Sequence, residues 1–281
     1  MSTKRIKKML VSPLAVIPRH HRYKVFRCLM KIPDPPDGVR FEPARTPEDS
    51  DAAFALLYEA YRKENLTPAS SSKRRITVYH SLATTSLLVA KLNNEVIATV
   101  SIIKDAGLGV PAQDIADLSR FRIPGKCMAE VSSLALKKDL RGQSSGVMFY
   151  LSKYLFKYSR EHLGIDRFII TFHPRQLPLY EGLFLFKTSC VNTVKNYGFA
   201  NNAPALCATL NFETAEHRFR KVYGKAPENR NLFQFFFRTF STREKACMRF
   251  PGHLSASLPE LPRREPPGPA VPFVSENCTI K

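Results

Sequence analysis

Residues 129–155 read AEVSSLALKKDLRGQSSGVMFYLSKYL, and their hydrophobic pattern changes period within this short segment. The first seven residues alternate, which is typical of a half-buried β-strand. After a basic turn that contains glycine, apolar residues recur at helical spacing from 146 to 162. A buried strand, IDRFIITF, follows at 165–172. This strand–turn–helix–strand unit restricts the chain to folds that mix helices and strands.

The rest of the chain repeats this mixture of periods. Thr46 and Pro47 mark the start of a helix, because a hydroxyl residue caps a helix and proline fits its first turn. In chain order, the expected elements are a strand at 38–44, a helix at 46–65, a hairpin at 84–105 turning at Asn93-Asn94, loops or short helices at 106–128, the unit described above, a short helix at 175–187, and strands at 191–199 and 203–212. We therefore predict an α/β fold with a mixed central sheet flanked by helices.

Composition divides the chain into four regions. Residues 1–38 are basic and end in the proline-rich sequence IPDPPDG, which predicts an N-terminal surface-binding arm. Residues 39–213 form the single α/β domain, residues 214–249 are expected to be a helical extension, and residues 250–281 a disordered, proline-rich tail. The N-terminus resembles a signal peptide, but Pro13 interrupts its apolar stretch and no small-residue cleavage site follows.

Charge and cysteine content limit the classes of partner and site. The chain has 43 Lys and Arg against 24 Asp and Glu, a formal net charge of +19, which favours nucleic acid, an anionic membrane or an acidic protein as partner. No nucleic-acid-binding motif is visible, so we expect no nucleic acid. The six cysteines form no C-x-x-C pair, which indicates neither zinc nor disulfides and favours a reducing cytoplasm. No metal site is expected, and no apolar run is long enough to span a membrane.

The turn LRGQSSG, at 140–146, offers a site for an anion. Backbone N–H groups at the start of a helix attract phosphate together with the helix dipole, and Arg141 adds a positive charge. The alternative is a surface turn in which Gly146 allows close packing.

The same turn carries a resemblance. Arg141, Ser144 and Gly146 have the spacing of the R-x-x-G-x-G/A turn that grips the pyrophosphate–pantetheine arm in the GNAT acyltransferase superfamily. The segments TTSLLVA, VIATVSIIKDAGLGVP, AEVSSLAL, FHPRQLPLYEGLFLF and NNAPALCATLNF, in this order, resemble the long-chain N-acyl amino acid synthases, which are relatives of the acyl-homoserine lactone synthases. This resemblance covers roughly residues 50–213. It implies a GNAT-like fold and transfer of a fatty acyl group from acyl carrier protein to the amine of an amino acid.

The resemblance also implies a donor, an acyl-phosphopantetheine thioester, and no permanently bound cofactor. Ser144 replaces the first glycine of the turn and Met148 stands where a small residue is usual, which favours acyl carrier protein over coenzyme A. The positive net charge suits this acidic partner. Arg141 in the turn and Lys153, Lys157 and Arg160 on the helix after it are expected to be exposed and to form its docking surface.

Three residues are implied as catalytic. Glu130 opens the strand before the turn and would take a proton from the attacking amine, directly or through water. Tyr180 matches the position that donates a proton to the departing thiolate. His173 ends a buried strand, where active-site groups gather in α/β sheets. The alternatives are a strand-end salt bridge for Glu130, a core tyrosine for Tyr180 and a satisfied structural histidine for His173.

Other residues are implied in binding. Leu134 and Ala135 lie in the strand whose backbone pairs with pantetheine in GNAT proteins, beside the turn residues that bind the donor. Asp105 would bind the ammonium of the acceptor, or else only form a turn. Ser101 and Ser133 stand where the lactone synthases carry arginine, which argues for a different acceptor, an amino acid.

Two other functions stay open at this stage. One is a coenzyme A-dependent N-acetyltransferase, and the other is a GNAT-fold binding module without turnover, since serine has replaced the expected residue at three site positions. The aromatic segment NLFQFFFRTFSTREK, at 231–245, lies on a membrane, seals an acyl tunnel, or packs onto the domain.

Overall fold

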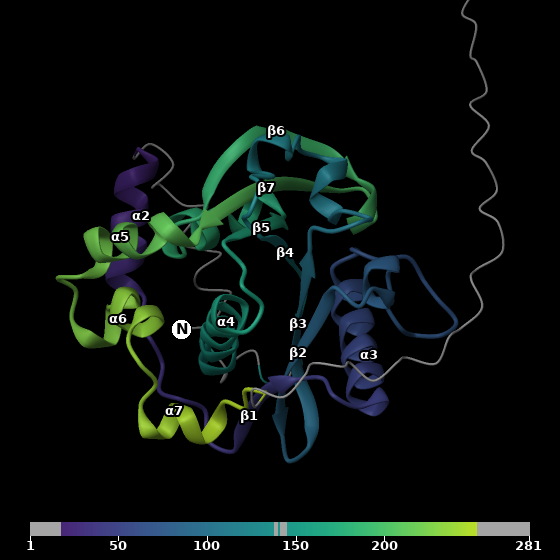
Figure 1. Cartoon of the computed structure of the whole chain (residues 1–281), viewed down its shortest axis with the longest axis horizontal. Helices are drawn as coiled ribbons and strands as arrows, with labels where there is room; N and C mark the ends of the chain where they lie inside the picture. The colour runs from purple at the N-terminus through teal and green to yellow at the C-terminus, as the bar shows by residue number, and fades with distance from the viewer. Residues whose placement is uncertain (1–17, 138–139, 141–144, 252–281) are drawn as a thin grey trace, which may run out of the picture.

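A mixed seven-stranded sheet forms the centre of the molecule (Figure 1). The computed structural model describes residues 18–137, 140 and 145–251. The strands lie in the order β1-β2-β3-β4-β5-β7-β6. Among the described pairs of neighbouring strands, β4–β5 is the parallel one and the others are antiparallel. Their bounds are Val39–Pro43 for β1, Thr85–Leu92 for β2, Glu95–Lys104 for β3, Met128–Leu136 for β4, Arg167–Phe172 for β5, Lys187–Tyr197 for β6 and Ala203–Asn211 for β7. The predicted mixed sheet is confirmed.

Helices cover both faces of this sheet. The Thr46 hydroxyl accepts a hydrogen bond from the Asp49 N–H and caps α3, as the sequence predicted. The helices are α2 (Arg19–Leu29), α3 (Pro47–Lys63), α4 (Ser145–Glu161), α5 (Phe212–Tyr223), α6 (Leu232–Phe237) and α7 (Thr242–Cys247), with short helical turns η2 (Val78–Ser81), η3 (Pro111–Asp114), η4 (Ser119–Phe121), η6 (Pro174–Gln176), η7 (Pro178–Leu183), η8 (Gly198–Ala200) and η9 (Glu228–Arg230).

The two faces carry different parts of the chain. Helix α4 connects the parallel strands and packs on one face with the C-terminal helices, over the largest hydrophobic cluster. Helix α3 lies on the opposite face (Figure 1), against β3 and β4. The loop at 106–127 covers this second face with a smaller cluster around Ile103 and Ile169. On the second face this loop lies beside α3, and loops on a rigid sheet commonly carry substrate-binding residues.

The segments expected to flank the domain pack onto it. Helix α2, inside the region expected to be a basic arm, lies on η7: the Tyr23 hydroxyl donates to Glu181 at 2.5 Å and the Arg27 Nε–H donates to the Gly182 carbonyl at 2.8 Å. At the other end, the Arg249 N–H donates to the Phe41 carbonyl of β1 at 2.8 Å. Helices α5, α6 and α7 lie in this C-terminal region. Residues 1–17 and 252–281, which include most of the expected tail, lie outside the described residues.

The prediction that Lys153 on α4 is exposed and forms part of a docking surface is wrong. Lys153 is fully buried, and its Nζ lies 2.6 Å from Oε1 of Glu244, whose side chain is also fully buried. The cause is the aromatic segment 231–245: α6 and α7 pack onto the side of α4 that faces away from the sheet, with Phe235 and Phe240 around the Lys153 ammonium. Of the three readings of that segment, the structure supports packing onto the domain.

Among the described residues, no helix has both the length and the apolar character needed to cross a bilayer.

Removing the carboxylate of Glu244 should leave the Lys153 ammonium without an anion in the core. Glu244→Leu should therefore lower the free energy of unfolding by about 3–5 kcal/mol, as breaking one partner of a buried ion pair does. Chemical denaturation measures this, and the double variant Lys153→Met/Glu244→Leu should recover most of the loss. Equal stability of Glu244→Leu and wild type would show that the ion pair does not hold α7 on α4.

Candidate active site

The two parallel strands separate in the middle of the sheet. Strands β4 and β5 pair from Met128 to Val131 on the β4 side, and beyond this no described pairing joins them. On its other side β4 stays paired with β3 as far as Leu136, but the register shifts between Thr99 and Ser101. At this β-bulge Ser133 has a φ of 56°. A bulge bends its strand, so the backbone edge of β4 at Leu134 and Ala135 turns away from β5 and can pair with an inserted amide-bearing chain.

Glu130 lies on β4, three residues before the bulge, and is fully buried. Its Oε2 accepts a hydrogen bond from the Ala112 N–H at 2.6 Å, and its Oε1 accepts from the Thr171 hydroxyl at 2.9 Å. No ion pair holds it within the described part of the chain, so the strand-end salt bridge is not found. Burial raises the pKa of Glu130 to about 8, against the lowering effect of the two hydrogen bonds, and the Asp114 charge raises it further. Such a carboxyl group can exchange a proton near neutral pH.

Tyr61 interacts with Glu130, and Tyr180 interacts with Tyr61. Tyr180, on η7, packs on Phe172 with ring centroids 4.7 Å apart, and burial followed by the charge of Tyr61 raises its pKa to about 12. Burial also raises the pKa of Tyr61, which is further raised by Glu130 and lowered by Arg75 and by a hydrogen bond from the Leu134 backbone. Tyr61 was missed in the sequence because it shares the helical spacing of the core residues of α3.

Ser101 and Ser133 have different surroundings. Ser101 is fully buried, and its Oγ lies 3.1 Å from Nε2 of His80. His80 Nδ1 accepts from the Thr77 N–H, so Nε2 carries the proton and donates to Ser101. Burial, and then the Arg75 charge, lowers the pKa of His80 to about 4, which keeps the imidazole neutral. The Ser133 hydroxyl is buried and has no hydrogen-bond partner among the described residues.

His173 and Asp105 are tied to local turns. His173 Nδ1 accepts from the Arg175 N–H at 3.2 Å and caps η6, and burial lowers its pKa. The two carboxylate oxygens of Asp105 accept from Arg122 at 2.7 and 3.0 Å. His173 thus has the local partner of a structural histidine, whereas Asp105 pairs with Arg122 rather than with a turn N–H, and no described contact joins either residue to Glu130.

Of the expected donor turn at 140–146, only residues 140, 145 and 146 are described. Arg141 and Ser144 lie outside the described residues. A Cβ added to Gly146 would lie 3.3 Å from the Asp34 carbonyl oxygen, which is tighter than an ordinary contact. The glycine thus allows the segment before β1 to pass close to α4, which is a packing role, and the proposed phosphate contact stays a prediction.

Sequence reasoning also missed Arg75, in the loop between α3 and η2. The sequence pattern SSSKRR indicates only a polar loop, yet Arg75 is 6% exposed and its guanidinium lies over the rings of Tyr61 and Phe199. No motif predicts this burial, because it depends on a turn more than 120 residues away.

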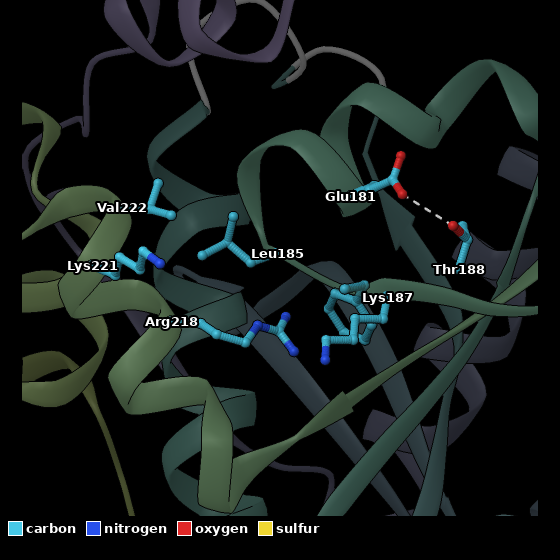
Figure 2. Close-up of a pocket in the computed structure, with 8 residues that line it drawn as sticks. Glu181, Leu185, Lys187, Thr188, Arg218, Lys221 and Val222 are labelled. Atoms are coloured by element: carbon cyan, nitrogen blue, oxygen red, sulfur yellow. Dashed lines mark hydrogen bonds between the residues drawn. The ribbon is translucent and has the colours of Figure 1, made fainter. Parts of the chain in front are cut away.

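A separate hollow of about 430 Å³ lies on the surface between η7, β6 and α5 (Figure 2). Lys187, Arg218 and Lys221 surround it together with Val222. Glu181 at its edge accepts hydrogen bonds from Tyr23 and Thr188. The hollow is basic and open to solvent. Helix α5, which carries Arg218, Lys221 and Val222, packs on the face of the sheet opposite α3.

Comparisons with known proteins give one family and a set of similar structures. The family model described as N-acyl amino acid synthase FeeM matches residues 52–211. The structure of FeeM, an N-acyl amino acid synthase from uncultured soil microbes, is 23% identical, with a TM-score of 0.55 over 64% of this chain and 93% of that one. The structure of the coenzyme A-dependent acyl-homoserine lactone synthase BjaI is 15% identical, with a TM-score of 0.45 over 67% of this chain and 90% of that one. The structure of the ribosomal-protein-S5-alanine acetyltransferase of Vibrio fischeri is 13% identical, with a TM-score of 0.43 over 63% of this chain and 94% of that one. Comparison with curated proteins gives no match.

The raised pKa of Glu130 predicts how stability depends on pH. Between the ordinary pKa of 4.5 and the folded value of about 8, the folded protein holds a proton that the unfolded chain has lost. The contribution of Glu130 to stability is thus fully present below pH 4.5 and is lost as pH rises through 8. Gln at this position does not titrate; its amide oxygen can accept from the Ala112 N–H while its NH2 group donates to the Thr171 hydroxyl.

Glu130→Gln should therefore gain stability relative to wild type as pH rises from 5 to 9, by at most about 1.4 kcal/mol per pH unit. Denaturation curves of both proteins at pH 5, 7 and 9 measure this difference. If the difference in free energy of unfolding between the two proteins is the same at all three pH values, the carboxyl group of Glu130 titrates normally.

Proposed function

The chain belongs to the N-acyl amino acid synthase FeeM family and is an N-acyltransferase, and from this premise we propose that it transfers a fatty acyl group from acyl carrier protein to the amine of an amino acid. The GNAT-like fold expected from the sequence is confirmed. The observation that carries the proposal is the buried Glu130, with a pKa near 8, placed where β4 separates from β5.

The reaction needs a neutral amine, a polarised thioester and a protonated leaving group. In the proposed mechanism the amine nitrogen attacks the thioester carbonyl, a C–N bond forms and the C–S bond breaks. Glu130, in its ionised form, takes the proton that the amine loses, directly or through one water. Tyr180, kept protonated by its raised pKa, supplies a proton to the departing thiolate.

The donor arm is proposed to lie between the separated strands. A phosphopantetheine arm carries two amides, and the edge of β4 that faces β5 pairs with no described strand beyond Val131. The Leu134 N–H already donates to Tyr61, so we propose that other backbone groups at Leu134 and Ala135 pair with the arm. A backbone N–H at the bulge can also stabilise the oxyanion that forms on the thioester carbonyl. The turn with Arg141, Ser144 and Gly146 is proposed to hold the phosphate. Ser133, with its unpartnered hydroxyl, is proposed to face the acceptor.

The basic hollow on the surface supports acyl carrier protein as the donor. We define the docking surface as Lys187, Arg218, Lys221 and Val222. It combines positive charge with an exposed apolar side chain, Val222, and neighbouring α2 exposes Val25 and Leu29. This composition suits an acidic helical protein, and it replaces the surface on α4 that the burial of Lys153 removes.

Replacing the proposed base should stop chemistry without unfolding the protein. Glu130→Gln should lower turnover of acyl transfer by about 10²–10⁴-fold, the usual worth of general base catalysis. Turnover with a fatty acyl carrier protein and an amino-acid mixture measures this, and a melting curve confirms the fold. The matched control is Glu95→Gln, which alters an exposed carboxylate on β3. Unchanged turnover in Glu130→Gln would remove Glu130 from the mechanism.

Reversing charge on the docking surface should weaken use of the carrier protein. Lys187→Glu/Lys221→Glu should raise the KM for acyl carrier protein about tenfold or more, and added salt should narrow the difference. The KM for the same acyl group on coenzyme A should stay within about twofold, because the surface lies outside the proposed active site. Lys195→Glu, on an exposed position of β6, is the control. An equal rate with acyl-coenzyme A and no effect of the double variant would favour a coenzyme A-dependent enzyme.

A further inference from the structure

Arg75 is a buried cation without a described anionic partner. It is 6% exposed, and it takes part in no ion pair within the described part of the chain. Burying a charge is expensive unless an opposite charge or a full set of hydrogen bonds compensates it. The other fully buried cation discussed above, Lys153, has Glu244 as its partner. The missing anion at Arg75 therefore needs a separate explanation.

The side chain is held in place but is not fully satisfied. Its guanidinium carbon lies 4.5 Å from the ring centroid of Tyr61 and 4.9 Å from that of Phe199. Nη2 donates to the Phe199 carbonyl at 2.9 Å. Nη1 is buried and has no hydrogen-bond partner among the described residues. The guanidinium is thus fixed on its aromatic faces and at one edge, while a second donor is left for another group.

Its location is the face of the sheet that carries Glu130. The Arg75 N–H donates to the Phe54 carbonyl of α3 at 3.1 Å, and the ring of Phe54 lies 5.0 Å from that of His80. His80 in turn bonds Ser101, which lies opposite Ser132 in the β3–β4 register, next to the bulge. Arg75 therefore joins the loop after α3 to the β6–β7 turn, on the same face of the sheet as Glu130.

We propose that Arg75 binds the carboxylate of the acceptor amino acid. This inference rests on the proposed function and names the group that selects its acceptor. A planar guanidinium suits a carboxylate because two of its N–H groups can donate in parallel. With the carboxylate at Arg75, the amine of the same amino acid is directed toward Glu130. The Ser133 hydroxyl can then hydrogen-bond either the amine or the carboxylate of the acceptor. An acceptor without a carboxylate leaves the buried cation uncompensated and binds weakly.

The wild-type enzyme provides the first test. The best acceptor among the twenty amino acids is compared with its own primary carboxamide, at saturating acyl donor. Charge-assisted hydrogen bonds of this kind correspond to a factor of about 10–100 in binding, so the carboxamide should have a KM higher by that factor. Equal KM values for acid and carboxamide would overturn the assignment.

The second test removes the guanidinium. Arg75→Gln should raise the KM for the amino acid about 10–100-fold, leave the KM for its carboxamide within about twofold, and leave the KM for the acyl donor unchanged. Arg75→Lys keeps the positive charge but lacks the planar guanidinium. Its KM for the amino acid should therefore lie between those of wild type and Arg75→Gln. Arg62→Gln is the matched control, because Arg62 donates to the Thr67 carbonyl near the same loop but is exposed.

The outcomes separate this inference from the function on which it rests. If Arg75 only clamps the loop to the β6–β7 turn, Arg75→Gln will impair acid and carboxamide equally, and the inference fails. If Arg75→Gln does not fold, the wild-type comparison and the thermal shift of wild type by the amino acid against its carboxamide still decide the point. If no amino acid is acylated at all, the proposed function fails instead.

Discussion

The separation of β4 from β5 is the constraint on which the rest of the proposed site depends. Parallel strands normally continue to pair, and this pair stops after Val131 while β4 remains bonded to β3. The bulge at Ser133 produces the separation, at the cost of a left-handed backbone conformation in a residue other than glycine. Without it, the backbone edge of β4 would be used within the sheet, and no extended donor could reach the position beside Glu130.

Buried charge distinguishes structural from proposed functional positions in this protein. Lys153 and Glu244 neutralise each other in the core between α4 and α7, and Arg238 adds a second cation to the same carboxylate. Glu130 and Arg75 are buried on the opposite face of the sheet, and neither forms an ion pair with another described residue. A carboxyl group with a raised pKa and an arginine whose Nη1 has no hydrogen-bond partner among the described residues are both costly to bury. An amino acid would relieve both, because it brings an amine for one and a carboxylate for the other.

Local sequence patterns predicted most of the fold and only part of the site. The cap at Thr46, the hairpin at Asn93-Asn94 and the helix after β4 are signals carried by neighbouring residues, and each is found. Lys153 was wrongly placed in solvent, because helical spacing shows which residues share a face but not that α6 and α7 cover it. The family resemblance supplied Glu130, whereas the surroundings of Arg75 come from Tyr61 and Phe199, which are distant in the chain. No local pattern encodes such contacts.

Direct product analysis tests the central claim. The purified protein is incubated with a long-chain acyl carrier protein and the twenty amino acids, and the mixture is analysed by mass spectrometry while released carrier thiol is titrated. The account predicts an N-acyl amino acid formed in equal amount with the free thiol, and no such product when Gln replaces Glu130. Thiol release without an N-acyl amino acid, or acyl transfer from coenzyme A thioesters alone, would contradict it.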